Sequence, residues 1–325
     1  MSAAKRSSGK RRLSGGEDEP PAKRRARNER DSGRAQEDGE AQSSAKRRRE
    51  AAEEAGRRSG PSHKQLRKLQ AALQELQVPV LSVGEADALL GNDPQRLGAG
   101  SYGEAFLNAK DNVVVKYSFG FNEYLSSVSE VKAMAALKDV RGVQKLVGVC
   151  PERFMIATRY GGPILHSWLA KDSPLLPKHW IDIAAEIARI FSEIHSLGFV
   201  HNDIKTNNLC LEVTPDGLEV TVIDFGLAEK RGKRLHLSGG WDEVDCYPPE
   251  FFKKRGGRCR ARSDVYGIGK ILRKIFRRAR PETPALATWL ERSQRMKPTT
   301  RPKLDLLLEL LEEEKKKRMW RRLLR

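Results

Sequence analysis

The sequence predicts an α+β domain built in two parts, a β-rich first part with one main helix and a mostly helical second part. Between residues 95 and 160 the chain carries short β-branched runs separated by glycines, which is typical of strands and their turns. Beyond Gly161 and Gly162 the apolar residues recur at spacings of three and four, which is the period of a helix. Apolar residues make up 38% of the 325 residues, which is enough for a packed core.

The β-rich part contains three strand-like stretches and one amphipathic stretch. We expect strands over residues 95–109, 112–118 and 154–160, and a helix over residues 126–138. This part therefore forms a sheet with a single main helix.

The second part has five helical patterns and one hairpin. The helices are expected over residues 164–170, 177–197, 263–277, 284–293 and 303–324. Two short apolar runs, at 208–213 and 218–223, flank Thr214-Pro215-Asp216-Gly217, whose residue types suit a tight turn. They predict a β-hairpin between the helices.

The first 62 residues differ from the rest in composition. They hold 17 Lys or Arg and 11 Asp or Glu, one leucine and no aromatic residue, so they cannot bury enough apolar surface to fold, and we expect disorder. Four basic clusters predict recognition by the nuclear import machinery and a nuclear protein; the alternative is a solvated tail that only aids solubility. The same charges allow non-specific contact with nucleic acid, but the lack of aromatic residues argues against sequence reading. The clusters begin at Lys5, Lys10, Lys23 and Lys46.

Two helical segments flank the predicted domain, which we place at residues 80–311. Leucines at helical spacing over residues 63–79 predict an amphipathic helix that docks onto the domain; a dimer seam is the alternative, and the oligomeric state stays open. Residues 312–325 form a predicted helix extension with acids ahead of bases, ending in a basic segment. That segment could contact an acidic surface, DNA or a membrane.

Several classes of protein are excluded by composition. The chain has no apolar run of the roughly 18 to 20 residues that a membrane span needs, and its start lacks the apolar core of a secretory signal, so we expect an intracellular protein. Its four cysteines have no paired C-x-x-C spacing, which argues against a disulfide framework or structural zinc. They are Cys150, Cys210, Cys246 and Cys259.

A glycine-rich motif lies between the first two strand-like stretches. Gly98, Gly100 and Gly103 fit G-x-G-x-x-G, with Ser101 and Tyr102 between them. A strand follows the motif rather than a helix, which favours a hairpin that covers phosphates over a dinucleotide-binding turn. Glycines there let backbone N–H groups approach phosphate oxygens.

Two further motifs follow at set distances in the second part. Residues 201–208, His-Asn-Asp-Ile-Lys-Thr-Asn-Asn, fit H-x-D-x-K-x-x-N, and Asp224-Phe225-Gly226 follows the hairpin. With Lys116 in the strand Val113-Val114-Val115-Lys116, the motifs stand in the order and spacing of the eukaryotic protein kinases, which the chain resembles over residues 97–311. The resemblance implies a bilobal kinase fold, with an N-lobe at about 80–160 and a C-lobe at about 161–311.

The resemblance also implies roles for six residues. Lys116 would contact the α- and β-phosphates of ATP and pair with Glu130; Glu123 is the rival partner, but it lies so soon after Lys116 that little room is left to turn from strand to helix. Asp203 would accept or orient the proton of the substrate hydroxyl, Lys205 would neutralise the transferring phosphoryl group, and Asn208 with Asp224 would hold Mg²⁺. All six residue types are present, which favours an active enzyme.

Two residues of the predicted adenine pocket differ from the family pattern, and the two changes offset each other in volume. The resemblance places Ala105 and Val114 over the adenine, where the family usually has the two residue types in exchanged positions. Thr158 falls at the gatekeeper position, Tyr160 follows it two residues later, and Cys210 falls beneath the adenine. The pattern predicts a fairly open pocket.

Late motifs indicate the subclass. Tyr247-Pro-Pro-Glu250 resembles the A-P-E motif, and Arg301 matches the arginine that pairs with its glutamate in the family. Asp264 resembles the helix aspartate that bonds the catalytic-loop backbone, and Lys205 follows the serine/threonine pattern. The C-lobe is short, with 37 positions from Asp264 to Arg301.

Two departures concern regulation and substrate. Asn202 replaces the arginine that usually binds an activation-loop phosphate, so we predict activity without phosphorylation there. Residues 227–246 lack the usual threonine before the A-P-E motif, which makes the acceptor residue less certain. The same segment is rich in bases, which favours acidic protein substrates; a merely solvated loop is the alternative. The bases are Lys230, Arg231, Lys233, Arg234 and His236.

The sequence therefore predicts an ATP- and Mg²⁺-dependent protein kinase acting on serine or threonine. A catalytically weak kinase-like scaffold that recruits partners through its basic ends is the main alternative. A small-molecule phosphotransferase is disfavoured by the pair of Glu250 and Arg301.

Overall fold

The computed structural model describes residues 61–100, 102–170, 173–215, 217–239 and 247–324, which belong to a compact unit beginning at Gly60. The predicted disordered tail lies outside the described residues as far as residue 60, and its import signals lie wholly outside them. Ser101 and Cys246 lie outside them as well.

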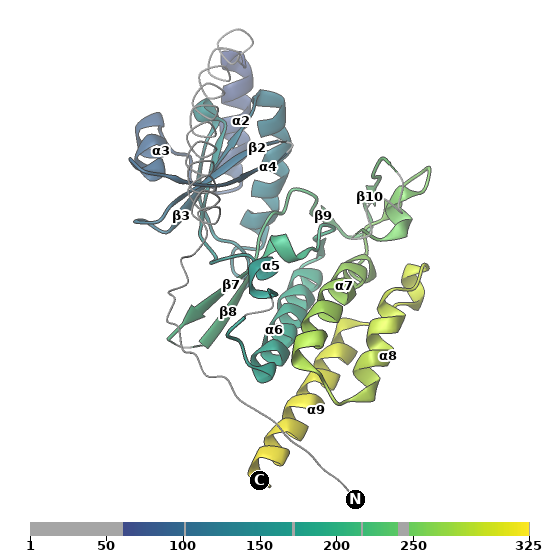
Figure 1. Ribbon diagram of the computed structural model, residues 1–325. Coiled ribbons are helices and arrows are strands. Elements are labelled where there is room, and N and C mark those ends of the chain that lie inside the picture. The colour runs from purple at the N-terminus through teal and green to yellow at the C-terminus, as the bar shows by residue number, and fades with distance from the viewer. Residues whose placement is uncertain (1–60, 101, 171–172, 216, 240–246, 325) are drawn as a thin grey trace, which may run out of the picture. The chain divides into compact units, whose positions relative to one another are not determined.

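An antiparallel sheet and one main helix form the N-lobe (Figure 1). The strand order is β1-β2-β3-β5-β4, and α4 carries the catalytic glutamate candidate. The elements are β1 (Gln95–Ala99), β2 (Gly103–Asn108), β3 (Val113–Ser118), α4 (Phe121–Ala136), β4 (Leu146–Cys150) and β5 (Met155–Arg159). The predicted stretch 95–109 is thus two strands joined at the glycine-rich turn, and β4 was not predicted.

Two helices precede the sheet and pack onto it. α2 (His63–Glu75) buries Leu69 and Leu73 in the main core, and Gln70 donates a hydrogen bond of 2.7 Å to Glu152. α3 (Val83–Leu90), which was not predicted, contributes Ala86 to a second cluster with residues of β3, β4 and β5. Residues that precede the first strand in sequence therefore contribute to the apolar clusters packed on the sheet.

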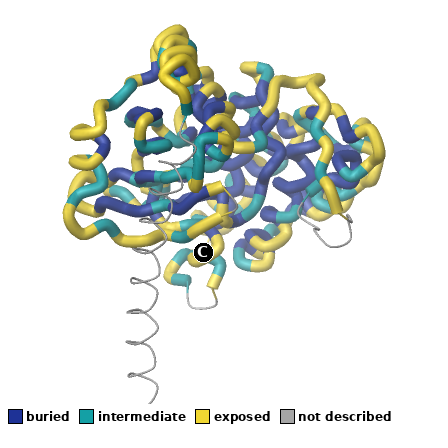
Figure 2. Tube along the Cα trace, turned by 90° about the horizontal axis from the view of Figure 1, so that it is seen from above, coloured by how far each residue is buried: buried dark blue, intermediate teal, exposed yellow. Residues whose placement is uncertain are grey.

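The C-lobe is built around α6 (Pro177–Ser196), whose Ile183, Ile187, Ile190 and Ile194 are all buried, as their spacing predicted. α7 and α9 pack against it, and α8 packs on α7 (Figure 1). Residues of α6, α7, α8 and α9 belong to the main buried core, and Figure 2 shows buried segments in the interior of the tube with exposed ones around its rim. The helices are α5 (Leu165–Trp168), α6, α7 (Ala261–Ala279), α8 (Pro284–Ser293) and α9 (Leu304–Leu323).

Short strands place the loops between these helices. The predicted hairpin is β7 (Leu209–Thr214) paired with β8 (Gly217–Val222). β6 (Phe199–Val200) pairs with β9 (Glu229–Lys230), and β10 (Arg234–Leu235) pairs with β11 (Gly257–Arg258). The β6–β9 pair ties the segment after the DFG motif to the strand that leads into the catalytic loop, and the β10–β11 pair ties it to the segment before α7. The predicted α+β class with a β-rich N-lobe and a helical C-lobe is confirmed.

We placed a domain boundary between residues 311 and 312, and α9 runs across it without a break, as the helix predicted over residues 303–324 requires. Glu314 is completely buried, and its Oε2 accepts from the backbone N–H groups of Glu282 and Thr283 at 3.0 and 2.9 Å. Its Oε1 accepts from Arg318 at 2.7 Å. The folded domain therefore includes this part of α9. Within the described residues, none of the helices is both long and apolar enough to cross a membrane.

Candidate active site

One face of the N-lobe sheet gathers the predicted nucleotide contacts. Ala105 lies opposite Lys116 in the pairing of β2 with β3, and Val114 lies opposite Thr158 in the pairing of β3 with β5. Directly opposed residues share a face, and residues two apart on one strand share it too. Ala105, Val114, Lys116 and Thr158 are therefore on the same face of the sheet.

Lys116 forms an ion pair with Glu130 across the gap between β3 and α4. The Nζ–Oε2 distance is 2.8 Å, and the side chains are 31% and 6% exposed. Burial acts to lower the pKa of Lys116, but the charges of Glu130 and then Asp224 outweigh it and raise the pKa. The lysine is therefore held as a cation whose charge faces the cleft side of the sheet.

Our reason for setting Glu123 aside was wrong. α4 begins at Phe121, five residues earlier than predicted, with Gly120 as its N-cap in an extended conformation (φ −167°), two residues after β3 ends. Glu123 thus lies in the first turn of α4, while Glu130, two turns further on, reaches Lys116. Distance along the helix, not room to turn, selects the partner.

The glycine-rich turn has two kinds of glycine. A Cβ at Gly103 would lie 2.0 Å from the carbonyl oxygen of Tyr117, so the strand pairing itself demands glycine there. A Cβ at Gly98 or Gly100 would meet nothing within 4 Å, so the surrounding chain imposes no such demand. The open space beside these two suits a ligand that approaches the backbone closely. Tyr102 is exposed and its carbonyl accepts from the N–H of Phe119.

The catalytic loop holds one oxygen of Asp203 and leaves the other free. Oδ2 accepts from Lys205 Nζ at 2.8 Å and from Asn208 Nδ2 at 2.9 Å. Oδ1 is buried and has no hydrogen-bond partner among the described residues. Buried polar atoms are normally paired, so this exception calls for an explanation. Because it lies on the catalytic-loop aspartate, Oδ1 is available to a proton donor that the described residues do not supply.

Asp224 lies beside this loop in a conformation unusual for its residue type. Its φ is +63°, and its Oδ1 accepts from the N–H of Gly226 at 3.4 Å. Phe225 is fully buried, and its ring lies 4.8 Å from that of His201. The phenylalanine anchors the strained turn so that the carboxylate stays near the catalytic loop.

Asn208 and Asp224 fit the requirements of Mg²⁺. Asn208 uses its Nδ2 to hold Asp203, which leaves its Oδ1 for a cation. Within the described residues there is no cluster of three or more His, Cys, Asp or Glu that could hold a metal. Mg²⁺ commonly binds through one or two protein oxygens together with waters and substrate phosphates, so this pair is sufficient.

Asp264 on α7 supports the catalytic loop from beneath. It accepts from the backbone N–H groups of His201 and Asn202, each at 2.9 Å, and its Oδ2 is 2.7 Å from Nε2 of His195. All four groups are buried. The loop backbone before Asp203 is thereby fixed, as the resemblance implied for Asp264. His195 was not predicted, because no local motif links it to an aspartate 69 residues away.

Glu250 and Arg301 form a bidentate buried pair, with distances of 2.8 and 2.7 Å. Ser263 donates a third hydrogen bond, of 3.0 Å, to Glu250. The arginine also donates to backbone carbonyls of Arg295 and Arg262. This network joins the segment after the A-P-E-like motif to α7 and to the start of α9.

The predicted adenine contacts lie at the junction of the lobes. Thr158 is buried, and its Oγ1 accepts from Gln144 at 2.9 Å, a contact that no sequence pattern indicated. Cys210 is buried on β7, and burial raises the pKa of its thiol to about 12, so it is a neutral apolar filler. Burial also raises the pKa of Tyr160, and the negative charge of Glu212 adds to the effect.

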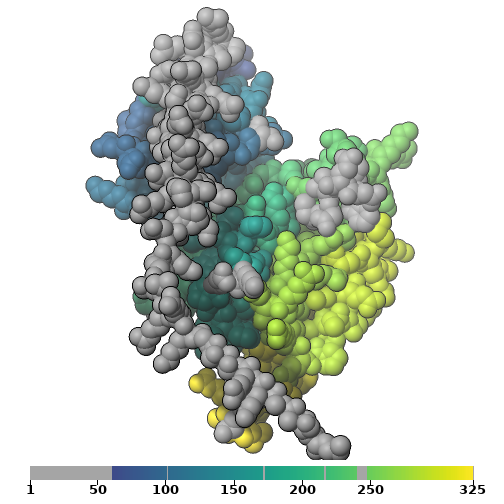
Figure 3. Space-filling model, viewed as in Figure 1, coloured from purple at the N-terminus to yellow at the C-terminus, as the bar shows by residue number. Residues whose placement is uncertain are grey.

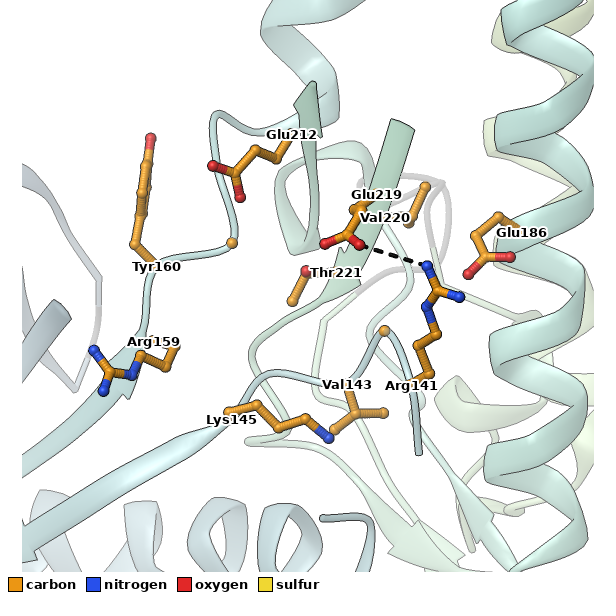
Figure 4. A pocket seen from close by; sticks show the side chains of 12 residues that line it. Arg141, Val143, Lys145, Arg159, Tyr160, Glu186, Glu212, Glu219, Val220 and Thr221 are labelled. Atoms are coloured by element: carbon orange, nitrogen blue, oxygen red, sulfur yellow. Dashed lines mark hydrogen bonds and ion pairs between the residues drawn. The ribbon is translucent and has the colours of Figure 1, made fainter. Parts of the chain in front are cut away.

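A hollow of about 270 Å³ has Tyr160 in its lining (Figure 4). Its walls come from residues 141–145, the end of β5, the β7–β8 hairpin and α6. Both charge signs line it, and Arg141 pairs with Glu219 at 3.5 Å. Apart from Tyr160 it includes none of the predicted site residues, so we assign the chemistry to the side chains gathered around Lys116 and Asp203.

Comparison of the chain with known proteins finds kinase sequences. The family model "Protein kinase domain" matches residues 92–320, more than half of the chain. The chain is 24% identical to the probable serine/threonine-protein kinase fnkB of Dictyostelium discoideum over 155 residues, which cover 45% of this chain and 28% of fnkB. It is 30% identical to serine/threonine-protein kinase pkn3 of Myxococcus xanthus over 131 residues, covering 37% and 23%. It is 32% identical to the DNA damage-responsive serine/threonine-protein kinase RqkA of Deinococcus radiodurans over 154 residues, covering 45% and 22%. The matches span less than a third of each relative.

Proposed function

Because the chain belongs to the protein kinase family, we propose that it transfers the γ-phosphoryl group of Mg-ATP to serine or threonine hydroxyls of proteins. The observation that carries the proposal is the asymmetry of Asp203, with one oxygen held by Lys205 and Asn208 and the other buried without a partner. The serine/threonine assignment follows the position of Lys205 and the names of the similar proteins.

Each residue has a defined part in the transfer. Oδ1 of Asp203 accepts the proton of the substrate's hydroxyl group. The hydroxyl oxygen then bonds to the γ-phosphorus while the bond between the γ-phosphorus and the β–γ bridging oxygen breaks, which releases ADP. Lys205 lies 2.8 Å from Asp203 and offers a positive charge to the transferring group. Lys116, fixed by Glu130, orients the remaining phosphates.

Magnesium would neutralise the phosphate charge that develops during transfer. Asn208 and Asp224 would hold it, for the reasons given above. The open backbone at Gly98 and Gly100 would lie over the phosphates and exclude water.

The test is transfer of radiolabelled γ-phosphate from Mg-ATP to a panel of proteins and peptides, followed by phosphoamino acid analysis. We expect phosphoserine or phosphothreonine from the native chain and a loss of at least about 10³-fold with Asp203→Asn. Asp139→Asn, an exposed carboxylate on the described surface, is the matched control and should leave transfer unchanged.

Two outcomes would overturn the proposal. Nucleotide binding by both proteins with no transfer to any protein would favour the scaffold alternative. Turnover of a sugar or amine without transfer to a protein would favour a small-molecule phosphotransferase.

A further inference from the structure

Two segments of the C-lobe expose a dense group of basic side chains. One follows the DFG motif and includes β9 and β10, and the other includes β11 and the approach to α7. The two segments lie side by side because β10 pairs with β11 (Figure 1). We call their exposed lysines and arginines the basic surface: Lys230, Arg231, Lys233, Arg234, Lys253, Lys254, Arg255, Arg258 and Arg260.

The basic surface is connected directly to the catalytic loop. β9 pairs with β6, the strand that leads into His201, and the N–H of Arg231 donates to Gly198 at 2.8 Å. From the other segment, the N–H of Cys259 donates to Lys233 at 2.7 Å, and Asn202 approaches the Cys259 sulfur at 3.5 Å. Asn202 is the residue before Asp203. The surface therefore lies next to the position where an acceptor hydroxyl must sit.

The arginines of the basic surface hold its two segments in place through hydrogen bonds, whereas three of its lysines have no side-chain partner among the described residues. Arg231, Arg234 and Arg258 donate from their guanidinium groups to backbone carbonyls, which fixes the two segments. Lys233, Lys253 and Lys254 have exposed side chains with no hydrogen bond or ion pair to a described residue. Their charges are available to a partner.

Few acids offset these charges. Glu229 is exposed beside Lys230, whereas Glu250 is buried and taken by Arg301. Residues 240–246, which lie outside the described part of the chain, add Asp242, Glu243 and Asp245. Even with these counted, bases outnumber acids across residues 229–260. In Figure 3 this part of the chain forms the green projection at the upper right.

We propose that the basic surface binds acidic side chains that flank the acceptor hydroxyl of a protein substrate, an inference that rests on the function proposed above. Uncompensated positive charge beside Asp203 attracts carboxylates by Coulomb interaction and disfavours basic flanking residues. Nucleic acid is the weaker candidate, because the surface adjoins the catalytic loop, where a protein acceptor must lie, and the described residues of both segments expose no large aromatic side chain on which unpaired bases could stack.

The test compares two charge-matched triple variants of the full chain. K233Q/K253Q/K254Q removes three free lysines from the basic surface. K64Q/K68Q/K178Q removes three exposed lysines from α2 and the start of α6, and none of these has a side-chain bond to a described residue. Each protein is assayed on two serine peptides that differ only in whether the flanking residues are Asp and Glu or Asn and Gln.

We expect the native chain and the control variant to prefer the acidic peptide by tenfold or more in kcat/KM at low salt. The surface variant should lose about tenfold on the acidic peptide, about 1.4 kcal/mol, while its rate on the amide peptide stays the same. The preference should also fall steeply between 0.05 and 0.5 M salt, because exposed charges are screened.

Other results would overturn the inference. A native chain that uses both peptides equally, or a surface variant that keeps the preference, removes the basis for acidic recognition. Loss of duplex DNA binding in the surface variant without a change in peptide preference would assign the surface to nucleic acid.

A failure of the proposed function would look different. In that case no peptide is phosphorylated by any of the proteins, whereas binding of a fluorescent acidic peptide, measured by anisotropy, still reports on the surface. Binding that is equal in the two triple variants would then overturn the surface inference independently.

Discussion

Two groups of buried charges in the C-lobe use the same residue types but differ in how completely their bonds are satisfied. Asp264 and the Glu250–Arg301 pair accept or donate at nearly every available position. Asp203 keeps one buried oxygen without a described partner. The first group forms a structural frame, because its hydrogen-bonding atoms find partners within the fold. The second is a functional site, because Oδ1 of Asp203 is left for a partner that a substrate would supply. Removing a residue from each should therefore have opposite effects on stability and activity.

The largest effect is expected at the unsatisfied site. Asp203→Asn should reduce phosphoryl transfer by at least about 10³-fold while changing the free energy of unfolding by less than about 1 kcal/mol, because the amide oxygen can accept the hydrogen bonds made to Oδ2 and Oδ1 has no bond to lose. Urea unfolding beside the transfer assay measures both. A large loss of stability would mean that Asp203 belongs to the frame.

Arg301→Ala should show the reverse. It leaves the buried Glu250 without its bidentate partner, which we expect to cost about 3 to 5 kcal/mol of stability. Thermal unfolding with bound nucleotide and without it would measure the loss. Arg295→Ala is the control. Arg295 is an exposed arginine near Arg301 in sequence, and its side chain has no bond to a described residue, so this variant should change stability by less than about 0.5 kcal/mol.

Glu314→Gln tests the frame at the other end of the C-lobe. Burial acts to raise the pKa of Glu314, but hydrogen bonds from Arg318, Thr283 and Glu282 outweigh it and lower the pKa. A lowered folded pKa means that the carboxylate stabilises the fold above its unfolded pKa and that this stability is lost as pH falls through the folded value. The native chain should therefore exceed the variant by about 1 to 3 kcal/mol at pH 7, with the difference shrinking in acid. Chemical unfolding at a series of pH values checks this, and a pH-independent difference would contradict it.

The smallest effect is expected at the adenine end. Ala105 and Val114 share the cleft face of the sheet, so Ala105→Val places two branched side chains there. We expect ATP affinity to fall about threefold to tenfold, with little change in unfolding. Titration with a fluorescent nucleotide measures it; the double variant A105V/V114A should restore affinity, and unchanged affinity in the single variant would refute the packing argument.

Sequence predicted the fold best where periodicity was strong. The isoleucines of α6 and the turn residues between β7 and β8 each indicate one structure, and the observed elements follow them closely. α3 is short and weakly periodic, yet Ser82 and Glu85 form a capping box that could have revealed it. The start of α4 was misplaced by five residues, since the helix begins at Phe121, only three residues after the last residue of β3.

The family resemblance predicted by the motifs is confirmed. Motif residues could be named because their spacing along the chain is short and ordered. Partners such as His195 for Asp264, or Gln144 for Thr158, meet only after folding and leave no local pattern. The free oxygen of Asp203 likewise emerges only from the geometry of its neighbours.

Asn202 carries one more consequence. It has a φ of +66°, a conformation that asparagine tolerates better than most residues, and its Nδ2 donates to the carbonyl of Leu227 at 2.9 Å, directly after the DFG motif. The side-chain amide of Asn202 thus holds the start of the segment after the DFG motif through a hydrogen bond within the chain. In relatives with an arginine at this position, a phosphate bound to the arginine would hold that segment. A phosphatase has nothing to remove from this hydrogen bond, so we expect phosphatase-treated and untreated enzyme to have the same activity.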